Sequence, residues 1–177
     1  MTKYLFLGAT AFLLFPSTSS FANDWSTYFK NDEMRGTAQK FVRSVSDNSV
    51  DFDFPYNGGS QMTIVLRSKK VTLKEGQKPD DLKPTEAVLV MSKGQFLCNS
   101  FNDCHISVKF DDGKIQQYSM TEAADGSSDV IFFENSASFI KNVSSHKKLI
   151  IEAEFYQAGT KQFKFDLTGY SSPKIEQ

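Results

Sequence analysis

The sequence predicts a mainly β protein, an antiparallel β-sandwich or open barrel with one short helix. Apolar and polar residues alternate along most of the chain, as in Val50–Phe54 and Ile106–Phe110, and this period of two puts apolar side chains on one face of a strand. Groups of Asn, Asp and Gly separate the alternating segments and predict tight turns. Phenylalanine, with 17 copies in 177 residues, favours pleated, half-buried surfaces. Many short strands around one core indicate a sandwich or barrel.

Residues 1–22 predict a secretory signal peptide. A short basic start precedes the apolar run Tyr4–Phe15, and Ser20–Ala22 puts small residues at the positions that signal peptidase reads. We therefore expect cleavage before Asn23 and a single β-rich domain over residues 23–177. The apolar run is well short of the roughly 20 residues of a membrane-spanning helix. The expected location is the bacterial periplasm, or alternatively the medium after secretion.

The segment from Thr37 to Ser46 fits either a helix or a strand, because its apolar residues match both periodicities. We favour a strand over Phe41–Val45 that pairs with Val50–Phe54, since the two-residue turn Asp47-Asn48 would join them directly. Pro55 ends the second strand because it cannot donate to a central ladder.

The rest of the chain predicts further strands, one helix and polar connections. Apolar or alternating runs predict strands at 62–66, 71–73, 87–91, 104–110, 115–120, 130–133, 149–156 and 163–167. Residues 95–98 continue the strand at 87–91 or pair with it. Clusters of Gly, Pro, Asn or Asp predict turns or loops at 56–59, 75–85, 111–113, 125–128 and 158–160. A helix capped by Asn135 or Ser136 is expected over 135–143, because Phe139, Ile140 and Val143 share one face. From Gly169 onward we expect a tail.

The two cysteines of the chain, Cys98 and Cys104, are expected to form a structural disulfide, because an exported protein meets an oxidising compartment. Their C-x5-C spacing does not match the C-x-x-C of thioredoxin-like redox sites, and a zinc site would need His105 and a distant ligand in addition. We expect the bridge to join facing strand ends and to fix the shape of a hairpin tip, residues 99–103.

Composition and motif spacing exclude several classes of function. With 20 Lys and Arg against 21 Asp and Glu and a net charge of −1, the chain lacks the basic field of a nucleic-acid-binding protein. The mature chain contains no second apolar run, so no membrane span is expected after cleavage. Metal-ligand sets, phosphate loops and the G-x-S-x-G elbow all lack their spacing. We therefore expect no cofactor and no metal, and assign no catalytic residue.

The disulfide-bridged loop is the most specific surface feature that the sequence predicts. A disulfide lowers the entropy cost of ordering a loop on binding, so such a loop suits insertion into the cleft of a partner. Phe101 would be its apolar anchor, unless the bridge only secures a hairpin and Phe101 folds back onto the sheet. The predicted partner-binding residues are Asn99, Ser100, Phe101, Asn102, Asp103 and His105.

Six features spread over most of the mature chain carry a resemblance. They are Trp25, Phe54–Gly59, the pair Cys98 and Cys104, Val108–Asp111, Ile151–Tyr156 and Phe163–Asp166. In these features the chain resembles small exported bacterial β-rich proteins, a resemblance that implies no activity. The bridged loop is also similar in kind to the loop that some periplasmic lysozyme inhibitors present between two cysteines. Those inhibitors insert a histidine from within the loop, whereas His105 lies just outside it.

The first hypothesis for function is a non-catalytic periplasmic protein that binds a periplasmic or secreted protein through the bridged tip. An envelope hydrolase is an alternative, and it requires His105 or His146 to lie in a cleft beside a carboxylate. A carrier for a small apolar ligand is a further alternative, in which the phenylalanines line a cavity instead of filling a core.

Overall fold

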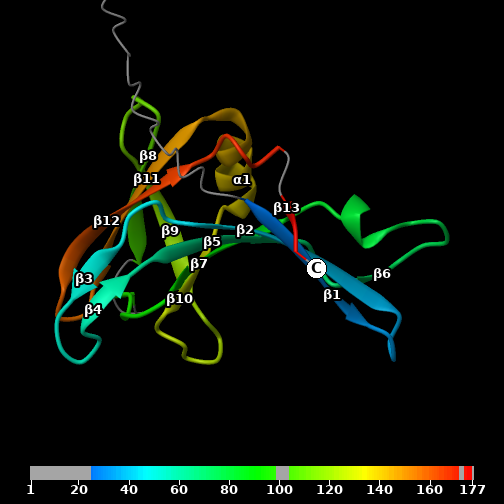
Figure 1. The fold of residues 1–177 in the computed structure, drawn as a ribbon, viewed down its shortest axis with the longest axis horizontal. Coiled ribbons are helices and arrows are strands. Elements are labelled where there is room, and N and C mark those ends of the chain that lie inside the picture. Colours follow the sequence, from blue (N-terminus) through cyan, green and yellow to red (C-terminus); the bar gives the residue numbers. More distant parts are fainter. Residues whose placement is uncertain (1–24, 99–103, 172–173, 177) are drawn as a thin grey trace, which may run out of the picture.

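The computed structural model describes residues 25–98, 104–171 and 174–176, and Figure 1 shows the fold. The protein is mainly antiparallel β, with 49% strand and 9% helix, and its sheets do not close into a barrel. The predicted fold class is thus confirmed, in a form consistent with a sandwich. The described strands are β1 (Ser26–Asp32), β2 (Thr37–Val45), β3 (Val50–Phe52), β4 (Gly58–Ser60), β5 (Met62–Arg67), β6 (Val71–Thr72), β7 (Glu86–Met91), β8 (His105–Phe110), β9 (Gln116–Glu122), β10 (Val130–Phe133), β11 (Lys148–Phe155), β12 (Gly159–Asp166) and β13 (Lys174–Ile175). The described helices are α1 (Ser136–Ser145) and the short 3-10 turn η1 (Pro79–Asp81).

Eleven strands form one sheet in the order β12-β11-β8-β9-β10-β7-β5-β2-β1-β13, with β6 beside β2. Every pairing in this sheet is antiparallel except that of β1 with β13. Strands β3 and β4 form a separate two-stranded hairpin. Among the described residues, no helix has the length and apolar character needed to cross a membrane.

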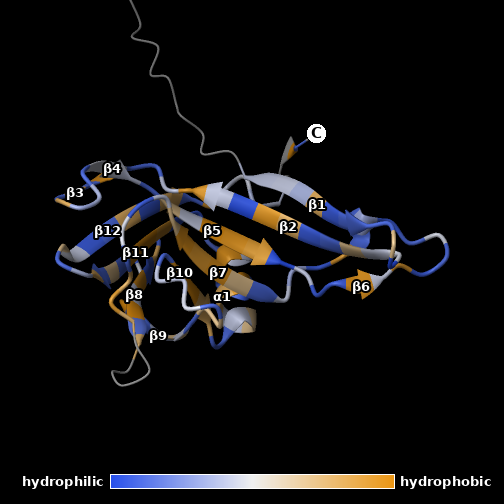
Figure 2. Ribbon diagram, turned by 90° about the horizontal axis from the view of Figure 1, so that it is seen from below, coloured by the Kyte–Doolittle hydropathy of each residue, from blue (hydrophilic) through white to orange (hydrophobic). Residues whose placement is uncertain are grey.

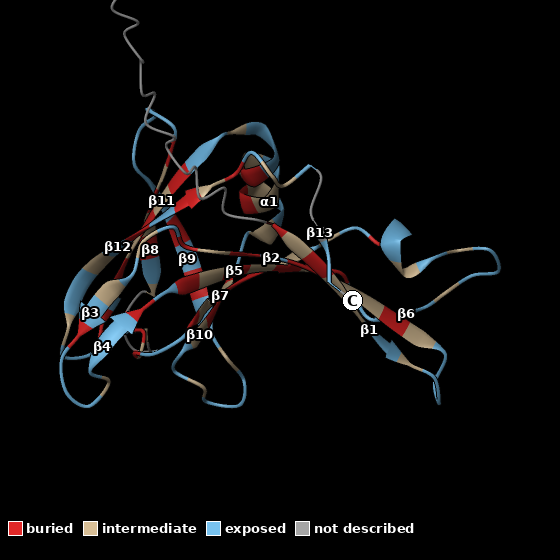
Figure 3. Ribbon diagram, in the orientation of Figure 1, coloured by how far each residue is buried: buried red, intermediate tan, exposed pale blue. Residues whose placement is uncertain are grey.

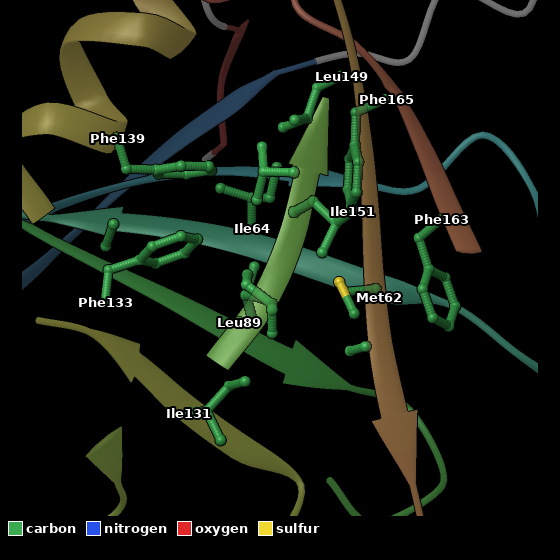
Figure 4. Packing of buried hydrophobic residues seen from close by; sticks show 14 of the residues in the cluster. Met62, Ile64, Leu89, Ile131, Phe133, Phe139, Leu149, Ile151, Phe163 and Phe165 are labelled. Atoms are coloured by element: carbon green, nitrogen blue, oxygen red, sulfur yellow. The ribbon is translucent and has the colours of Figure 1, made fainter. Parts of the chain in front are cut away.

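The large sheet folds over so that two groups of strands face each other across the core. We call β2, β5, β7 and β10 the first leaf, and β8, β9, β11 and β12 the second leaf. Figure 4 shows Ile64, Leu89 and Ile131 of the first leaf pointing towards Ile151 and Phe165 of the second. Figure 2 shows the matching hydrophobic colour along β5 and β7.

A short connection joins the two leaves at one end of the sandwich. After β2 ends, the backbone N–H of Asp47 donates to Lys164 O on β12 at 2.7 Å. The Asn48 side chain both donates to Gln162 O and accepts from the Lys164 N–H. These bonds give the outer edge of β12 partners, which limits its capacity to pair with another strand.

The same bonds explain why the predicted pairing of Phe41–Val45 with Val50–Phe54 is wrong. The strand at 41–45 exists, but it pairs with β1 and β5. Asp47 and Asn48 bond to β12 instead of forming a two-residue turn, so the chain crosses to the other leaf. Strand β3 then pairs with β4.

Helix α1 covers one end of the core, as its sequence predicts. The Asn135 side chain accepts from the Ser138 N–H at 3.1 Å and caps the first turn. Phe139 and Val143 are fully buried, and the Phe139 ring stacks on Phe133 with 3.9 Å between centroids. Burial of this face stabilises a helix too short to be stable alone.

Both ends of the described chain form strands that the sequence did not predict. Ser26–Asp32 pairs with β2, and part of the expected tail forms β13 beside β1. Trp25 fixes the start of this region, because its indole N–H donates to Asp166 O at 3.0 Å and its ring meets Tyr170 edge-on. Weak alternation in β1 hid this strand from the sequence pattern.

Candidate functional site

The predicted disulfide between Cys98 and Cys104 is confirmed, with 4.9 Å between the two Cα atoms. Residues 1–24 and 99–103 lie outside the described residues. The predicted signal peptide therefore remains a prediction, as does the role of five of the predicted binding residues, Asn99, Ser100, Phe101, Asn102 and Asp103. The candidate site therefore consists of the described residues on either side of the disulfide.

The bridge does not lie at the tip of a simple hairpin, which corrects the expected pairing of residues 95–98. Phe96 forms an isolated bridge with Phe155 at the end of β11. On either side, the Leu97 N–H donates to Glu154 O and the Tyr156 N–H donates to Gln95 O, both at 2.9 Å. The segment before Cys98 thus extends along β11, next to the place where β8 pairs with that strand. The disulfide links this segment to the start of β8.

This pairing determines which side chains point outwards. Phe96 and Phe155 are buried, and their rings pack with 5.0 Å between centroids. Because side chains alternate across a strand, Leu97 and Tyr156 point to the opposite, outer face. They are 44% and 49% exposed. They occupy diagonal positions of one antiparallel pair, a spacing of about 7 to 8 Å between Cα atoms that large side chains can span.

The β3–β4 hairpin lies at the same end of the molecule (Figure 1). Phe52 anchors it, with its ring 5.3 Å from that of Phe155 and 6.3 Å from that of Tyr56. Gly94 allows this close approach, because a Cβ atom added there would lie 3.0 Å from the Phe52 ring. Its φ of +104° is also strained for any other residue.

Phe54 lies on the turn of this hairpin and is 80% exposed. The backbone N–H groups of Tyr56 and Asn57 both donate to Asp53 O, at 3.0 and 3.1 Å, so the chain turns directly after β3. The alternation that puts Phe52 inside ends at this turn, and Phe54 remains in solvent. Sequence reasoning missed this residue because it read Phe54 as the last inward position of a strand.

We call Phe54, Leu97 and Tyr156 the disulfide-end patch. The three side chains come from separate segments that the aromatic contacts of Phe52, Phe96 and Phe155 hold at one end of the sandwich. Large apolar side chains that are exposed at one end of a molecule are candidates for an interaction site. Two sequence signals point to this patch: Phe54 directly precedes Pro55, and Tyr156 lies just before the turn at 158–160.

The backbone beneath the patch is fixed by a small polar network. The Ser60 hydroxyl donates to Lys93 O at 2.8 Å and accepts from the Lys93 N–H at 3.0 Å. The Lys93 ammonium group donates to Asn57 O at 3.2 Å. These contacts join the β3–β4 hairpin to the chain segment that leads into Cys98. They lower the ordering cost of a surface that binds at this end.

His105, the described member of the predicted binding set, begins β8 and is exposed. It pairs with Ser119 on β9, and the Glu134 N–H donates to Ser119 O at 3.1 Å. His105, Gln117, Ser119 and Glu134 line an open hollow of about 530 Å³ next to Cys104. The structure therefore brings one of the two histidines near a carboxylate, in a groove open to solvent.

His146 has a structural position at the end of α1. Its Nδ1 lies 2.9 Å from Asn142 O in the last helical turn, and its ring packs 4.9 Å from Phe110. The neighbouring Asp111 carboxylate accepts from the N–H groups of Lys148 and Lys147, at 2.8 and 3.0 Å. These bonds lower the pKa of Asp111, and the bond from the Lys148 N–H has the largest effect. This arrangement secures the β8–β9 turn.

The phenylalanines fill the core instead of lining a cavity. Phe139, Phe155, Phe163 and Phe165 are each at most 2% exposed, and ring contacts continue from Phe155 to Phe163 and from Phe139 to Phe133. This packing argues against the carrier hypothesis. Within the described ranges, no group of three or more His, Cys, Asp or Glu side chains is arranged to hold a metal ion.

Comparisons with protein-family models, with curated proteins and with solved structures find no significant match to this chain.

Proposed function

We propose that this protein is an exported, non-catalytic binding protein that recognises a periplasmic or secreted protein through its disulfide end. Its proposed mature form is the single domain 23–177, left when residues 1–22 are removed. The binding surface consists of the disulfide-end patch, His105 and the bridged loop 99–103. The Cys98–Cys104 disulfide supports an oxidising location.

The exposure of Phe54 carries this proposal. An aromatic ring that is 80% exposed gains no core packing, while the rigid turn around it holds the ring outwards. Aromatic side chains supply much of the energy at protein interfaces when a partner covers them. Leu97 and Tyr156 enlarge the apolar area at the same end, and Lys93 and Glu154 give it a polar border.

The chemistry of the patch indicates the kind of partner. Three exposed apolar side chains fit a shallow apolar pocket or groove, with polar groups at its rim. A short segment that a disulfide closes, as Cys98–Cys104 closes residues 99–103, suits entry into a cleft. A folded protein with a concave apolar site matches both features better than a small ligand does.

A capture experiment tests this function. The full chain is expressed with its leader, recovered from the periplasm and immobilised, and bound proteins from periplasmic extract and culture supernatant are quantified by mass spectrometry. We expect one partner to be retained by the wild type and by Ile115→Ser, and to be lost with Phe54→Ser. Ile115 is a matched control because it is 68% exposed at the opposite end of β8. Equal recovery by Phe54→Ser and the wild type would refute the role of the patch.

An envelope hydrolase is a second candidate, favoured by the proximity of His105, Ser119 and Glu134 along neighbouring strands. A histidine between a hydroxyl and a carboxylate can act as a general base. The hollow is open to water, so it offers little of the preorganised, water-excluding environment on which such catalysis depends. Hydrolysis of envelope esters, glycans or peptides by the wild type that disappears in His105→Ala would establish this alternative.

A further inference from the structure

The β1–β2 hairpin extends beyond the two leaves of the sandwich (Figure 1). Strand β2 pairs with β5 from Phe41 onward, and its first residues pair instead with the two-residue strand β6. Strand β1 continues beside β2 as far as Asp32. Figure 3 shows the far end of this hairpin in the colours of intermediate and exposed residues. We call residues 28–40 and 71–72 the arm.

The outer edge of the arm is largely uncovered. The sheet ends with β13, which pairs with β1 only at Ser26 and Thr27, whereas β1 pairs with β2 along all seven of its residues. The other end of the sheet differs, because Asp47 and Asn48 bond to the edge of β12. Within the described ranges, residues 28–32 therefore form an edge strand that has no neighbouring strand on its outer side.

The hydrogen bonds of β1 show which of its backbone groups point outwards. The Glu176 N–H donates to Thr27 O at 2.8 Å, so the backbone of Thr27 faces β13 and not β2. Since successive residues of a strand direct their backbone groups to opposite sides, the N–H and C=O groups of Phe29 and Asn31 also face outwards. No hydrogen bond from the described part of the chain engages these four groups. Such a row of unpaired groups is a template for another strand.

Side-chain contacts hold the arm in the extended form that strand addition needs. The Tyr28 and Phe41 rings stack with 4.8 Å between centroids and 6° between their planes. Near the tip, the Lys70 ammonium group donates to the Asp32 carboxylate at 3.0 Å. The register between β1 and β2 is continuous and contains no bulge. The edge is therefore formed in advance, which lowers the ordering cost when another strand adds to it.

Lys30 determines the charge that a partner strand should carry. Its exposed side chain lies between Phe29 and Asn31 in the edge strand, and its ammonium group is 5.2 Å from the centre of the Phe41 ring. Among the described residues, no carboxylate forms an ion pair with it. The residue opposite Lys30 on an added strand has its Cβ about 4.5 to 5.5 Å away. An acidic side chain at that position therefore pairs with the ammonium group.

A second copy of this chain does not supply such a carboxylate. Two β1 strands that pair about a two-fold axis must place their outward residues opposite each other, so Lys30 would face Tyr28, Lys30 or Asp32 of the second copy. The Asp32 carboxylate already binds Arg35 and Lys70, at 3.1 and 3.0 Å. The arm therefore fits an extended segment of another protein better than it fits a second copy.

We propose that the outer edge of the arm binds an extended acidic segment of another protein, which adds to the sheet as a strand beside residues 29–32. The backbone groups of Phe29 and Asn31 hydrogen-bond to this segment, as in β-strand addition, and its carboxylate pairs with Lys30. The β3–β4 hairpin lies at the opposite end of the molecule (Figure 1). This site is therefore separate from the disulfide end, and neither binding surface depends on the other.

Amide hydrogen exchange of the full chain, followed residue by residue by NMR, tests the proposal. The probe is a capped peptide of about seven residues, an ordinary strand length, in which glutamate alternates with valine. The matched probe has lysine in place of glutamate. At millimolar concentration the glutamate peptide should slow exchange of the Phe29 and Asn31 N–H groups by about tenfold or more, and the lysine peptide should leave it unchanged. Unchanged exchange of both groups with the glutamate peptide would overturn the proposal.

Two substitutions separate strand addition from loose attachment of the peptide. Asn31→Pro removes an outward N–H and leaves the bonds between β1 and β2 in place, since proline is tolerated where the N–H of an edge strand faces solvent. It should weaken binding of the glutamate peptide by about tenfold or more, whereas the matched control Asn31→Thr keeps the N–H and should bind as the wild type does. Lys30→Glu should reverse the preference in favour of the lysine peptide. Equal binding by Asn31→Pro and the wild type, or an unchanged preference in Lys30→Glu, would contradict the proposal.

Discussion

Phe52 and Phe54 are two residues apart, and we predict that replacing Phe52 lowers the stability of the fold whereas replacing Phe54 does not. Phe52 is 4% exposed and packs against Phe155, Tyr56 and Gly94, whereas Phe54 is 80% exposed. Truncation of a buried phenylalanine to alanine costs about 3 to 5 kcal/mol through lost burial and the cavity left behind. Phe52 lies at an end of the core, beside the flexible Lys161 side chain, which can partly fill the space. We therefore expect about 3 kcal/mol for Phe52→Ala.

Urea unfolding followed by circular dichroism measures both effects. At a slope of about 2 kcal/mol per molar urea, Phe52→Ala should lower the midpoint by about 1.5 M. Phe54→Ala should change the free energy of unfolding by no more than about 0.5 kcal/mol, as expected for an exposed side chain. If Phe54→Ala is as costly as Phe52→Ala, the ring of Phe54 is packed inside the fold, and the reasoning about the exposed patch fails.

Three further predictions concern stability. Replacing both Cys98 and Cys104 with serine should cost about 2 kcal/mol in urea unfolding, because the bridge closes a short loop in the unfolded chain; an unchanged midpoint would show that the bridge adds no constraint. The hydrogen bond from the Lys148 N–H is the main cause of the lowered pKa of Asp111 in the folded protein. The ionised carboxylate therefore makes its full contribution to stability above the ordinary Asp pKa of about 4. That contribution disappears as the pH falls through the lower folded-state pKa. The melting temperature of Asp111→Asn should therefore fall less than that of the wild type between pH 5 and pH 2. An equal fall in both proteins would show that the Asp111 carboxylate makes no such bonds in solution. Asn135→Ala should cost about 1 kcal/mol in the same unfolding assay by removing the cap of α1, whereas no loss would mean that Ser136 or water replaces the cap.

The sequence predicted what depends on local periodicity. Alternating segments such as 104–110 and 149–156 form β8 and β11, and the capped helix forms α1. The period of two determines which face of each strand is buried, so the inward residues of these strands were identifiable.

Long-range pairings were not predictable from the same patterns. Asp47-Asn48 has the composition of a hairpin turn, yet hydrogen bonds to β12, more than a hundred residues later, direct the chain elsewhere. The pairing of 95–98 with β11 depends likewise on Phe96 meeting Phe155. Local turn propensity is weak compared with several tertiary hydrogen bonds and a buried ring contact.

The candidate site depends partly on local sequence and partly on long-range strand pairing. The disulfide followed from the two cysteines and the expected compartment, without knowledge of the fold. The disulfide-end patch required tertiary structure, because Phe54, Leu97 and Tyr156 come from segments that are distant in sequence.

The affinity of the captured partner for Phe54→Ala, compared with the wild type and with Ile115→Ala, tests the central claim most directly. Isothermal titration calorimetry should show at least a tenfold loss of affinity for Phe54→Ala, as for a central aromatic side chain of an interface. Ile115→Ala should bind as the wild type does. Unchanged affinity of Phe54→Ala, with its fold intact by circular dichroism, would contradict the claim that the disulfide end is the binding surface.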